Sequence, residues 1–286
     1  MMKRKLEELN LMDDFLFQEM VSKEGIGEEF CRILLSTILN RTIQKVRIIP
    51  QKTVAGIDTG NHGIRLDAYV QEISSDDIST DDIEVSTDVY DIEPNNTYEK
   101  ESLPRRTRYY DALIDSQLLE SGTDYGHMKN VIIIMILPYD PFDRKRMVYT
   151  VQNRCVEDSS VSYDDGLKKI YLYTKGTAGN PGKALRDMLK YIENSTDDNV
   201  TDENIAKIHG FVDKVKRDKE VGINYMKSWE REQMIHKEGL EEGLKEGLER
   251  VNQLNLKLIE ASRTEDMIRA ARDREFQEKL FEEFGL

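Results

Sequence analysis

The sequence predicts a mixed α/β domain followed by a helical region, and three observations indicate this. An unbroken apolar run at 131–137 is typical of a strand covered on both faces. Apolar and polar residues alternate at 63–71 and again at 86–93, as in strands with two different faces. From Lys183 to the end of the chain, the sequence reads as helical throughout.

The elements of the α/β part follow in order and end near Lys175. Helical periodicity predicts one or two helices at the start, and Ser102, Pro104 and Gly122 are suited to the two ends of a later helix. The expected helices are Leu11–Asn40 and Ser102–Ser121, and the expected strands are Val46–Val54, Gly63–Gln71, Ser86–Glu93, Asn130–Leu137, Met147–Gln152 and Lys169–Tyr173. We therefore expect a domain at 1–175 and a helical region at 176–286.

An acidic, Ser-rich segment at 73–87 separates the two alternating strands. Its composition predicts a loop that closes a hairpin. Pairing Asp67 with Glu93 across this hairpin also pairs Glu72 with Asp88, so the strand register agrees with the loop boundaries.

The helical region contains a repeat, KEGLEEGLKEGL at 237–248, in which Gly and Leu each recur every four residues. Such leucines form a slanting stripe on a helix, and each Gly weakens the helix by about 1 kcal/mol relative to Ala. Three interpretations stay open: an exposed, charged helix, a helix through which copies of the chain associate, or a recognition helix, which the nearly balanced charge of the segment favours least.

Composition restricts the class of protein. The chain has 286 residues, a net charge of -14 and two cysteines, Cys31 and Cys155, so a disulfide framework and a Cys-based zinc site are not expected. Neither a signal peptide nor a membrane span is expected, and a reducing cytoplasm fits. The negative charge argues against avid, non-specific binding to DNA or to anionic membranes, so DNA binding requires a local basic face or a bridging metal.

The hairpin places two carboxylates together. Asp67 and Glu93 are expected on one face with Asn95, about 5 Å apart as cross-strand neighbours. Two carboxylates at that spacing are hard oxygen ligands suited to Mg²⁺. The alternative is that each is an ordinary strand carboxylate facing solvent.

Several stretches together resemble the PD-(D/E)XK nuclease family transposases, also called recombination-promoting nucleases. They are LNLMDDFLFQEM at 9–20, GIRLDAY at 63–69, VYDIEPN at 89–95, LPRRTRYYDALIDSQLLESGTDY at 103–125, NVIIIMILPYDPF at 130–142 and the Glu-Gly-Leu repeat. The resemblance spans roughly the whole chain, and the order and spacing of the stretches carry it. It implies a restriction-endonuclease-like mixed sheet flanked by helices, in a cytoplasmic bacterial protein.

The resemblance also implies a site. Asp67 and Glu93 match the pair that binds Mg²⁺, or Mn²⁺ in its place, and the carbonyl of Pro94 is a further candidate ligand. Asn95 stands where the family has a Lys or Gln that orients the attacking water; Asn offers neither the charge nor the reach, but it can donate a hydrogen bond. Asp14 matches an acidic residue that often completes such sites, although Asp13 is equally near in sequence.

A basic cluster follows Glu93 in the sequence and is a candidate for contacting a phosphodiester. Its members are Lys100, Arg105, Arg106 and Arg108. The alternative is that they form salt bridges with Glu99, Glu101 and Asp111.

Two functions from different classes follow. The first is a Mg²⁺-dependent DNA endonuclease acting in transposition or recombination, with DNA as its partner. The second is a catalytically degenerate core that serves as a binding scaffold, with the C-terminal helices as an oligomerisation module. The nuclease interpretation requires that Asp67 and Glu93 do not diverge, and that neither is buried in a salt bridge with an arginine.

Overall fold

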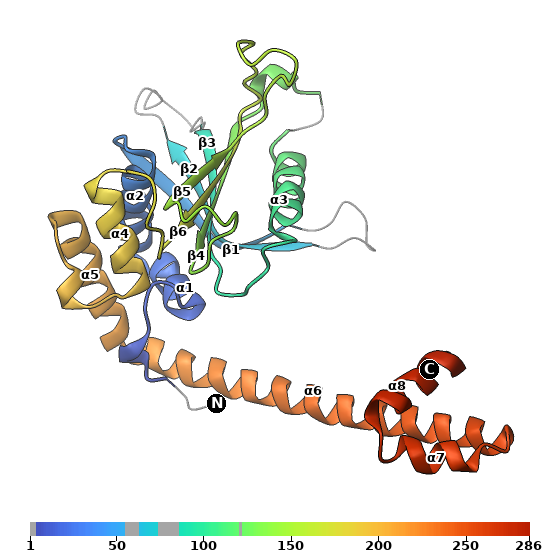
Figure 1. Ribbon diagram of the computed structural model, residues 1–286. Coiled ribbons are helices and arrows are strands. Elements are labelled where there is room, and N and C mark those ends of the chain that lie inside the picture. Colours follow the sequence, from blue (N-terminus) through green and yellow to red (C-terminus); the bar gives the residue numbers. More distant parts are fainter. Residues whose placement is uncertain (1–3, 55–62, 74–85, 120–121) are drawn as a thin grey trace. The chain divides into compact units, whose positions relative to one another are not determined.

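The protein contains a six-stranded mixed sheet with helices on both faces (Figure 1), as seen in a computed structural model that describes residues 4–54, 63–73, 86–119 and 122–286. The strand order is β1-β2-β3-β4-β6-β5. The first three strands are antiparallel, β3, β4 and β6 are parallel, and β5 is antiparallel at the edge. The strands are β1 (Lys45–Val54), β2 (Ile64–Ile73), β3 (Ser86–Pro94), β4 (Asn130–Leu137), β5 (Val148–Val151) and β6 (Leu167–Tyr173). The predicted α/β class is confirmed.

Helices cover the sheet in layers. Helices α1 and α2 lie against one face, α3 lies against the other, and α4 and α5 pack on α1 and α2 (Figure 1). Their bounds are α1 (Asp14–Ser22), α2 (Gly27–Leu39), α3 (Leu103–Leu118), α4 (Lys183–Glu193) and α5 (Glu203–Arg217), with short 3-10 turns at Leu6–Glu8, Tyr125–His127 and Asp197–Asn199.

The core lies on both sides of β4. Residues 131–137 of this strand are all buried, which confirms the central strand predicted from the apolar run. On one face α3 contributes Leu103, Leu113 and Ile114 to the core. On the other face Phe17 of α1 and Phe30 of α2 meet edge to face at 5.6 Å.

The hairpin register matches the prediction over most of its length. Ala68 lies opposite Ile92 and Gln71 opposite Val89, which is the register that pairs Asp67 with Glu93. The register then shifts, so that Ile73 lies opposite Ser86. The expected loop at 73–87 is therefore shorter at both ends, and its centre, 74–85, lies outside the described residues.

The regular alternation of β2 is broken next to Asp67. Leu66 and Tyr69 belong to the same core cluster, although strict alternation would place them on opposite faces. The adjacent strand β1 is irregular at the same level, because Gln51 has a φ of 51°. At this level of the sheet, the Asp67 carboxylate accepts a hydrogen bond from Gln18 of α1.

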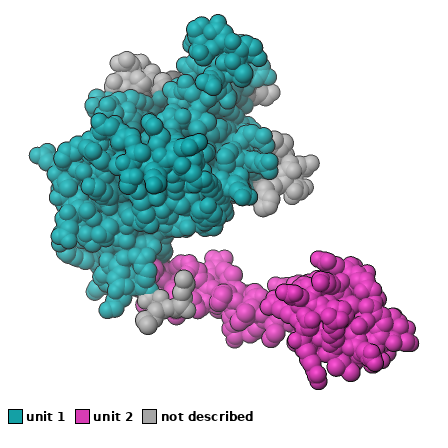
Figure 2. Space-filling model, viewed as in Figure 1, with its two compact units in different colours: residues 1–222 teal, residues 223–286 magenta. Residues whose placement is uncertain are grey.

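The chain divides into two compact units, residues 1–222 and 223–286 (Figure 2). The predicted boundary at residue 175 differs from this division, because α4 and α5 bury their apolar faces against α1 and α2 of the first unit. An amphipathic pattern indicates that a helix has a buried face, but it does not identify the element that covers that face.

The second unit is a helical hairpin with its own small core. It comprises the helix α6 (Lys219–Glu260) from Ile223 onward, with α7 (Thr264–Ala270) and α8 (Arg274–Phe284) folded against its end. Leu254, Leu258, Ala270, Leu280 and Phe281 form the buried cluster. Helix α7 begins at Thr264, and the helical structure predicted for this end of the chain is interrupted between α7 and α8.

The Gly-Leu repeat lies in the middle of α6, where Leu240, Leu244 and Leu248 are exposed. The exposure of these leucines leaves all three interpretations of the repeat open. None of the helices within the described ranges combines the length and the apolar character needed to cross a membrane.

Candidate active site

The site is built where β2 and β3 meet α1 on one side and α3 on the other. Strand β2 contributes Asp67, β3 contributes Asp91 and Glu93, α1 contributes Asp14, and α3 contributes Arg106. The sequence positions of these residues are far apart, and the sheet register together with the two helices brings them together.

Glu93 is at the centre of the site and is 2% exposed. Its Oε1 accepts a 3.0 Å hydrogen bond from the backbone N–H of Asp67, and its Oε2 accepts a 3.2 Å bond from Nη2 of Arg106. Burial, followed by the charge of Asp67, raises the pKa of Glu93 from 4.5 to about 7, although both donors oppose this. Arg106 therefore only partly compensates the buried carboxylate.

Asp67 is half-buried and is oriented by a short chain of amides. Its Oδ1 accepts a hydrogen bond of 3.2 Å from Nε2 of Gln18, and Oε1 of Gln18 accepts one of 2.7 Å from Gln51. Burial raises the pKa of Asp67, while Gln18, Arg65 and Arg106 lower it. Gln18 was not predicted as a site residue, although it follows Asp14 by one helical turn and so lies on the same side of α1.

The structure separates Asp14 from Asp13, which the sequence could not do. Asp13 is held away from the site, because its carboxylate pairs with Arg4 and accepts a 2.6 Å bond from the backbone N–H of Asn10. The Asp14 side chain is accessible to solvent at the start of α1, but the surrounding protein desolvates its carboxylate. This desolvation, together with the charge of the nearby Asp67, raises the pKa of Asp14 to about 6. Asp14 is thus the acid of this pair that faces the cluster.

Asp91 is a member of the site that sequence reasoning missed. It is fully buried, and its carboxylate oxygens meet no hydrogen-bond donor among the residues the structure describes, apart from a shared proton with the neighbouring carboxyl group of Glu93. Burial, then the charges of Glu93 and Asp67, raise its pKa well above the usual range. The available signal was alternation, because residues 91 and 93 of one strand lie on the same face.

Asn95 and Pro94 directly follow Glu93. The backbone N–H of Asn95 donates to Ile136 at 2.9 Å, which fixes this end of β3 beside β4. Its side-chain Oδ1 accepts a 2.9 Å bond from the N–H of Thr97, and its buried Nδ2 has no partner within the described part of the chain. The Nδ2 of Asn95 is therefore a free hydrogen-bond donor. A buried side-chain amide without a hydrogen-bond partner is rare in folded proteins, so this donor calls for a functional explanation. Pro94 is buried as the last residue of β3.

The predicted basic cluster does not act as one group. Arg106 turns inward to Glu93, Glu99 and Tyr110, and Lys100 pairs with Asp143. Arg105 and Arg108 are exposed on α3. The alternative of salt bridges is thus correct for Arg106 with Glu99, whereas Asp111 pairs with Lys169 instead.

The donor set fits a hard divalent cation in its chemistry. Four carboxyl groups gather here, Asp14, Asp67, Asp91 and Glu93, and the charge of Asp67 contributes to raising the pKa of each of the other three. Carboxylate oxygens are the ligands that Mg²⁺ prefers. Yet no three acidic, His or Cys side chains within the described ranges are arranged to hold a metal ion as they stand. The oxygens of Glu93 and Asp67 are instead held by protein donors.

The two requirements of the nuclease interpretation have different outcomes. Asp67 and Glu93 are neighbours, since the backbone N–H of Asp67 donates to Glu93 and the charge of the Asp67 carboxylate acts on Glu93, although no hydrogen bond joins the two side chains. Glu93, however, is buried in a salt bridge with Arg106, which is the arrangement that counts against catalysis. Burial and the charge of Asp67 nevertheless outweigh the effect of Arg106 and raise the pKa of Glu93.

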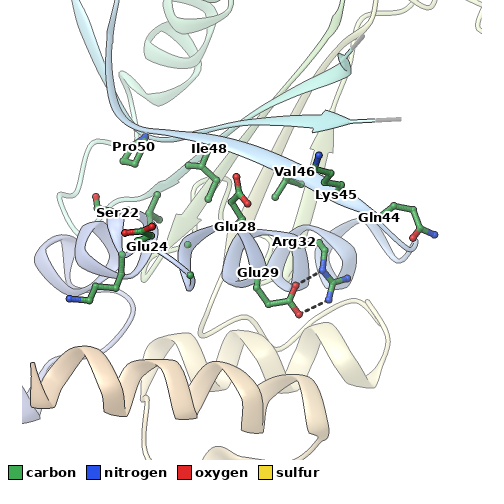
Figure 3. Close-up of a pocket in the computed structure, with 14 residues that line it drawn as sticks. Ser22, Glu24, Glu28, Glu29, Arg32, Gln44, Lys45, Val46, Ile48 and Pro50 are labelled. Carbon is green, nitrogen blue, oxygen red and sulfur yellow. Dashed lines mark hydrogen bonds and ion pairs between the residues drawn. The ribbon is translucent and has the colours of Figure 1, made fainter. Parts of the chain in front are cut away.

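A separate pocket of about 530 Å³ lies between the α1–α2 turn and β1 (Figure 3). Its charged groups are largely paired. A hydrogen-bonded ion pair with Arg32, helped by Lys207, lowers the pKa of Glu29 to about 2, and Lys23 pairs with Asp218. The pocket therefore lacks the unpaired buried groups found around Glu93.

No family model, curated protein or solved structure matches the chain. The functional argument therefore depends on the residues themselves.

Proposed function

We propose that this protein is a divalent-cation-dependent DNA endonuclease with a restriction-endonuclease-like fold, acting in the bacterial cytoplasm in transposition or recombination. One observation carries the proposal: carboxyl groups from α1, β2 and β3 gather around Glu93 with Arg106 as their cation. Buried like charges repel, so such a cluster is stable at neutral pH if it holds protons or a metal ion. The nuclease resemblance of the same segments favours the metal ion.

Asp67 and Glu93 are the proposed ligands of Mg²⁺ or Mn²⁺, on adjacent strands as the resemblance implies. Asp14 and the Pro94 carbonyl are proposed to complete the site. A bound cation lowers the pKa of a coordinated water and offsets charge on the scissile phosphate. Gln18 holds Asp67 in position, and the backbone N–H of Asp67 holds Glu93.

Asn95 is proposed to orient the attacking water. The contact between its Oδ1 and Thr97 fixes the side chain and leaves Nδ2 as the donor. This arrangement supports a positioning role without proton transfer, because an amide does not titrate near neutral pH. We expect a slower nuclease than one with Lys at this position.

The exposed Arg105 and Arg108 are proposed to contact the DNA backbone. Their guanidinium groups can donate two parallel hydrogen bonds to a phosphate. Because the chain has a net charge of -14, this local basic surface and the cation together are expected to provide the attraction for DNA.

Cleavage of supercoiled plasmid by the purified protein with Mg²⁺ or Mn²⁺ tests the proposal. Nicking that Asp67→Ala and Glu93→Ala both abolish supports it, and the exposed Glu101→Gln serves as a control that retains activity. Absence of cleavage by the wild type, or equal cleavage by all variants, refutes it.

A second function, a non-catalytic scaffold, is favoured by two specific observations. The Glu93–Arg106 salt bridge partly compensates the buried carboxylate without a metal, and Leu240, Leu244 and Leu248 form an exposed apolar stripe on α6. In this case copies of the chain associate through α6. Light scattering that finds an oligomer, and a monomer after the three leucines are changed to Glu, supports this function if no cleavage is detected.

A further inference from the structure

Arg106 is held by three acceptors at once. Its Nε donates to the hydroxyl of Tyr110 at 3.0 Å, its Nη1 donates to Glu99 at 2.9 Å, and its Nη2 donates to Glu93 at 3.2 Å. Tyr110 lies one turn along α3, and Glu99 lies in the segment before the helix. The guanidinium is thus fixed at the rim of the carboxylate cluster by two contacts outside the cluster and one inside it.

The two oxygens of Glu93 differ in how easily they are released. The partner of Oε1 is the backbone N–H of Asp67, which can move only if β2 moves. The partner of Oε2 is a side chain that is 28% exposed, on the longest of the three bonds that Arg106 makes. A cation that binds Oε2 of Glu93 therefore competes with the guanidinium for this oxygen, and the two positive groups repel.

We propose that Arg106 is the resident counter-ion of Glu93, which a divalent cation displaces from Oε2 when it binds. Glu99 and Tyr110 then keep the guanidinium at the rim, with its freed Nη2 directed to the phosphate of the substrate. This inference rests on the proposed nuclease function and deepens it. It also accounts for the present arrangement, in which donors occupy the carboxylates and no ready-made set of metal ligands exists among the described residues.

Glu99 is suited to hold the displaced arginine. Its side chain is 36% exposed, so an ion pair there stays close to solvent, whereas the one with Glu93 is buried. Breaking the buried contact leaves Arg106 with an anionic partner and a hydroxyl, so displacement does not leave a buried unpaired cation.

Mn²⁺ binding measured by titration calorimetry, without DNA, tests the inference. Arg106→Gln removes the competing charge, and we expect it to bind Mn²⁺ about tenfold or more tightly than the wild type. Arg105→Gln, on the exposed side of the same helix, is the matched control and is expected to stay within about twofold, because exposed charges are strongly screened. Plasmid cleavage by Arg106→Gln is expected to fall despite the tighter binding.

Glu99→Gln provides a second test that does not depend on losing the arginine. This substitution weakens the contact between Arg106 and Glu99, so the guanidinium pairs more strongly with Glu93 and is harder for a cation to displace. We expect Mn²⁺ binding to weaken about threefold or more beyond the effect of Glu101→Gln. Equal or weaker Mn²⁺ binding by Arg106→Gln overturns the inference, as does an unchanged affinity in Glu99→Gln. If the wild type binds no Mn²⁺, or if Glu93→Gln binds it equally well, the proposed function itself fails.

Discussion

Replacing Glu93 by Gln removes the charge at the centre of the cluster and keeps the shape of the side chain. The raised pKa of Glu93 means that the folded protein holds its proton more tightly than the unfolded chain does. The contribution of Glu93 therefore favours folding below pH 4.5, and this contribution is lost as the pH rises through about 7. Without metal, we expect Glu93→Gln to stabilise the protein at pH 8.

The size of the effect follows from the two pKa values. The difference between 4.5 and about 7 corresponds to roughly 3 kcal/mol at pH 8, at about 1.4 kcal/mol for each pKa unit. Asp91 and Asp67 share the same protons, and Gln loses the salt bridge to Arg106, so a gain of about 1–3 kcal/mol is expected. At pH 4.5 the variant and the wild type should differ by less than about 1 kcal/mol from this cause.

Urea unfolding followed by circular dichroism, in the presence of a chelator, measures the gain between pH 4.5 and pH 8. Glu101→Gln is the matched control, because its side chain is exposed and its stability relative to the wild type should not vary with pH. A Glu93→Gln variant that is equally or less stable than the wild type at pH 8 refutes the reasoning, because Arg106 would then fully compensate Glu93.

Three further predictions concern packing, and thermal unfolding measures each. Gly27→Ala should destabilise the first unit by about 2 kcal/mol or more, because its Cβ would lie 2.0 Å from the carbonyl oxygen of Val21; an unchanged midpoint contradicts this. Gly243→Ala, which meets nothing within 4 Å, should stabilise α6 by up to about 1 kcal/mol, and a loss of stability would indicate a close partner at that position. Leu258→Ala should destabilise the second unit by about 2–5 kcal/mol, since Leu258 is fully buried; a change below 1 kcal/mol would show that this core does not hold the unit together.

The strands near the site were predictable because two independent patterns agreed. Apolar residues on both faces identified β4, and the strand register followed from the positions of the acidic loop and of the alternating residues. That Asp67 and Glu93 meet was therefore predictable from the sequence. The register shift at Gln71–Ile73 was not predictable, because one extra residue in a strand does not change the alternation of apolar and polar residues in a recognisable way.

The differing roles of neighbouring arginines and acids were not predictable in the same way. Arg105, Arg106 and Arg108 are alike in sequence, but only Arg106 lies one helical turn before the core residue Tyr110. Alternation places Asp91 on the polar face of its strand, but it does not reveal which face α3 covers. Both roles depend on tertiary packing.

The location of a bound metal ion tests the central claim most directly. Crystals of the full chain soaked in Mn²⁺ should give an anomalous peak within about 2.5 Å of carboxylate oxygens from both Asp67 and Glu93, with Arg106 no longer on Glu93. A saturating soak that leaves the Glu93–Arg106 salt bridge intact, with no peak between the two acids, would contradict the proposed nuclease and favour the scaffold.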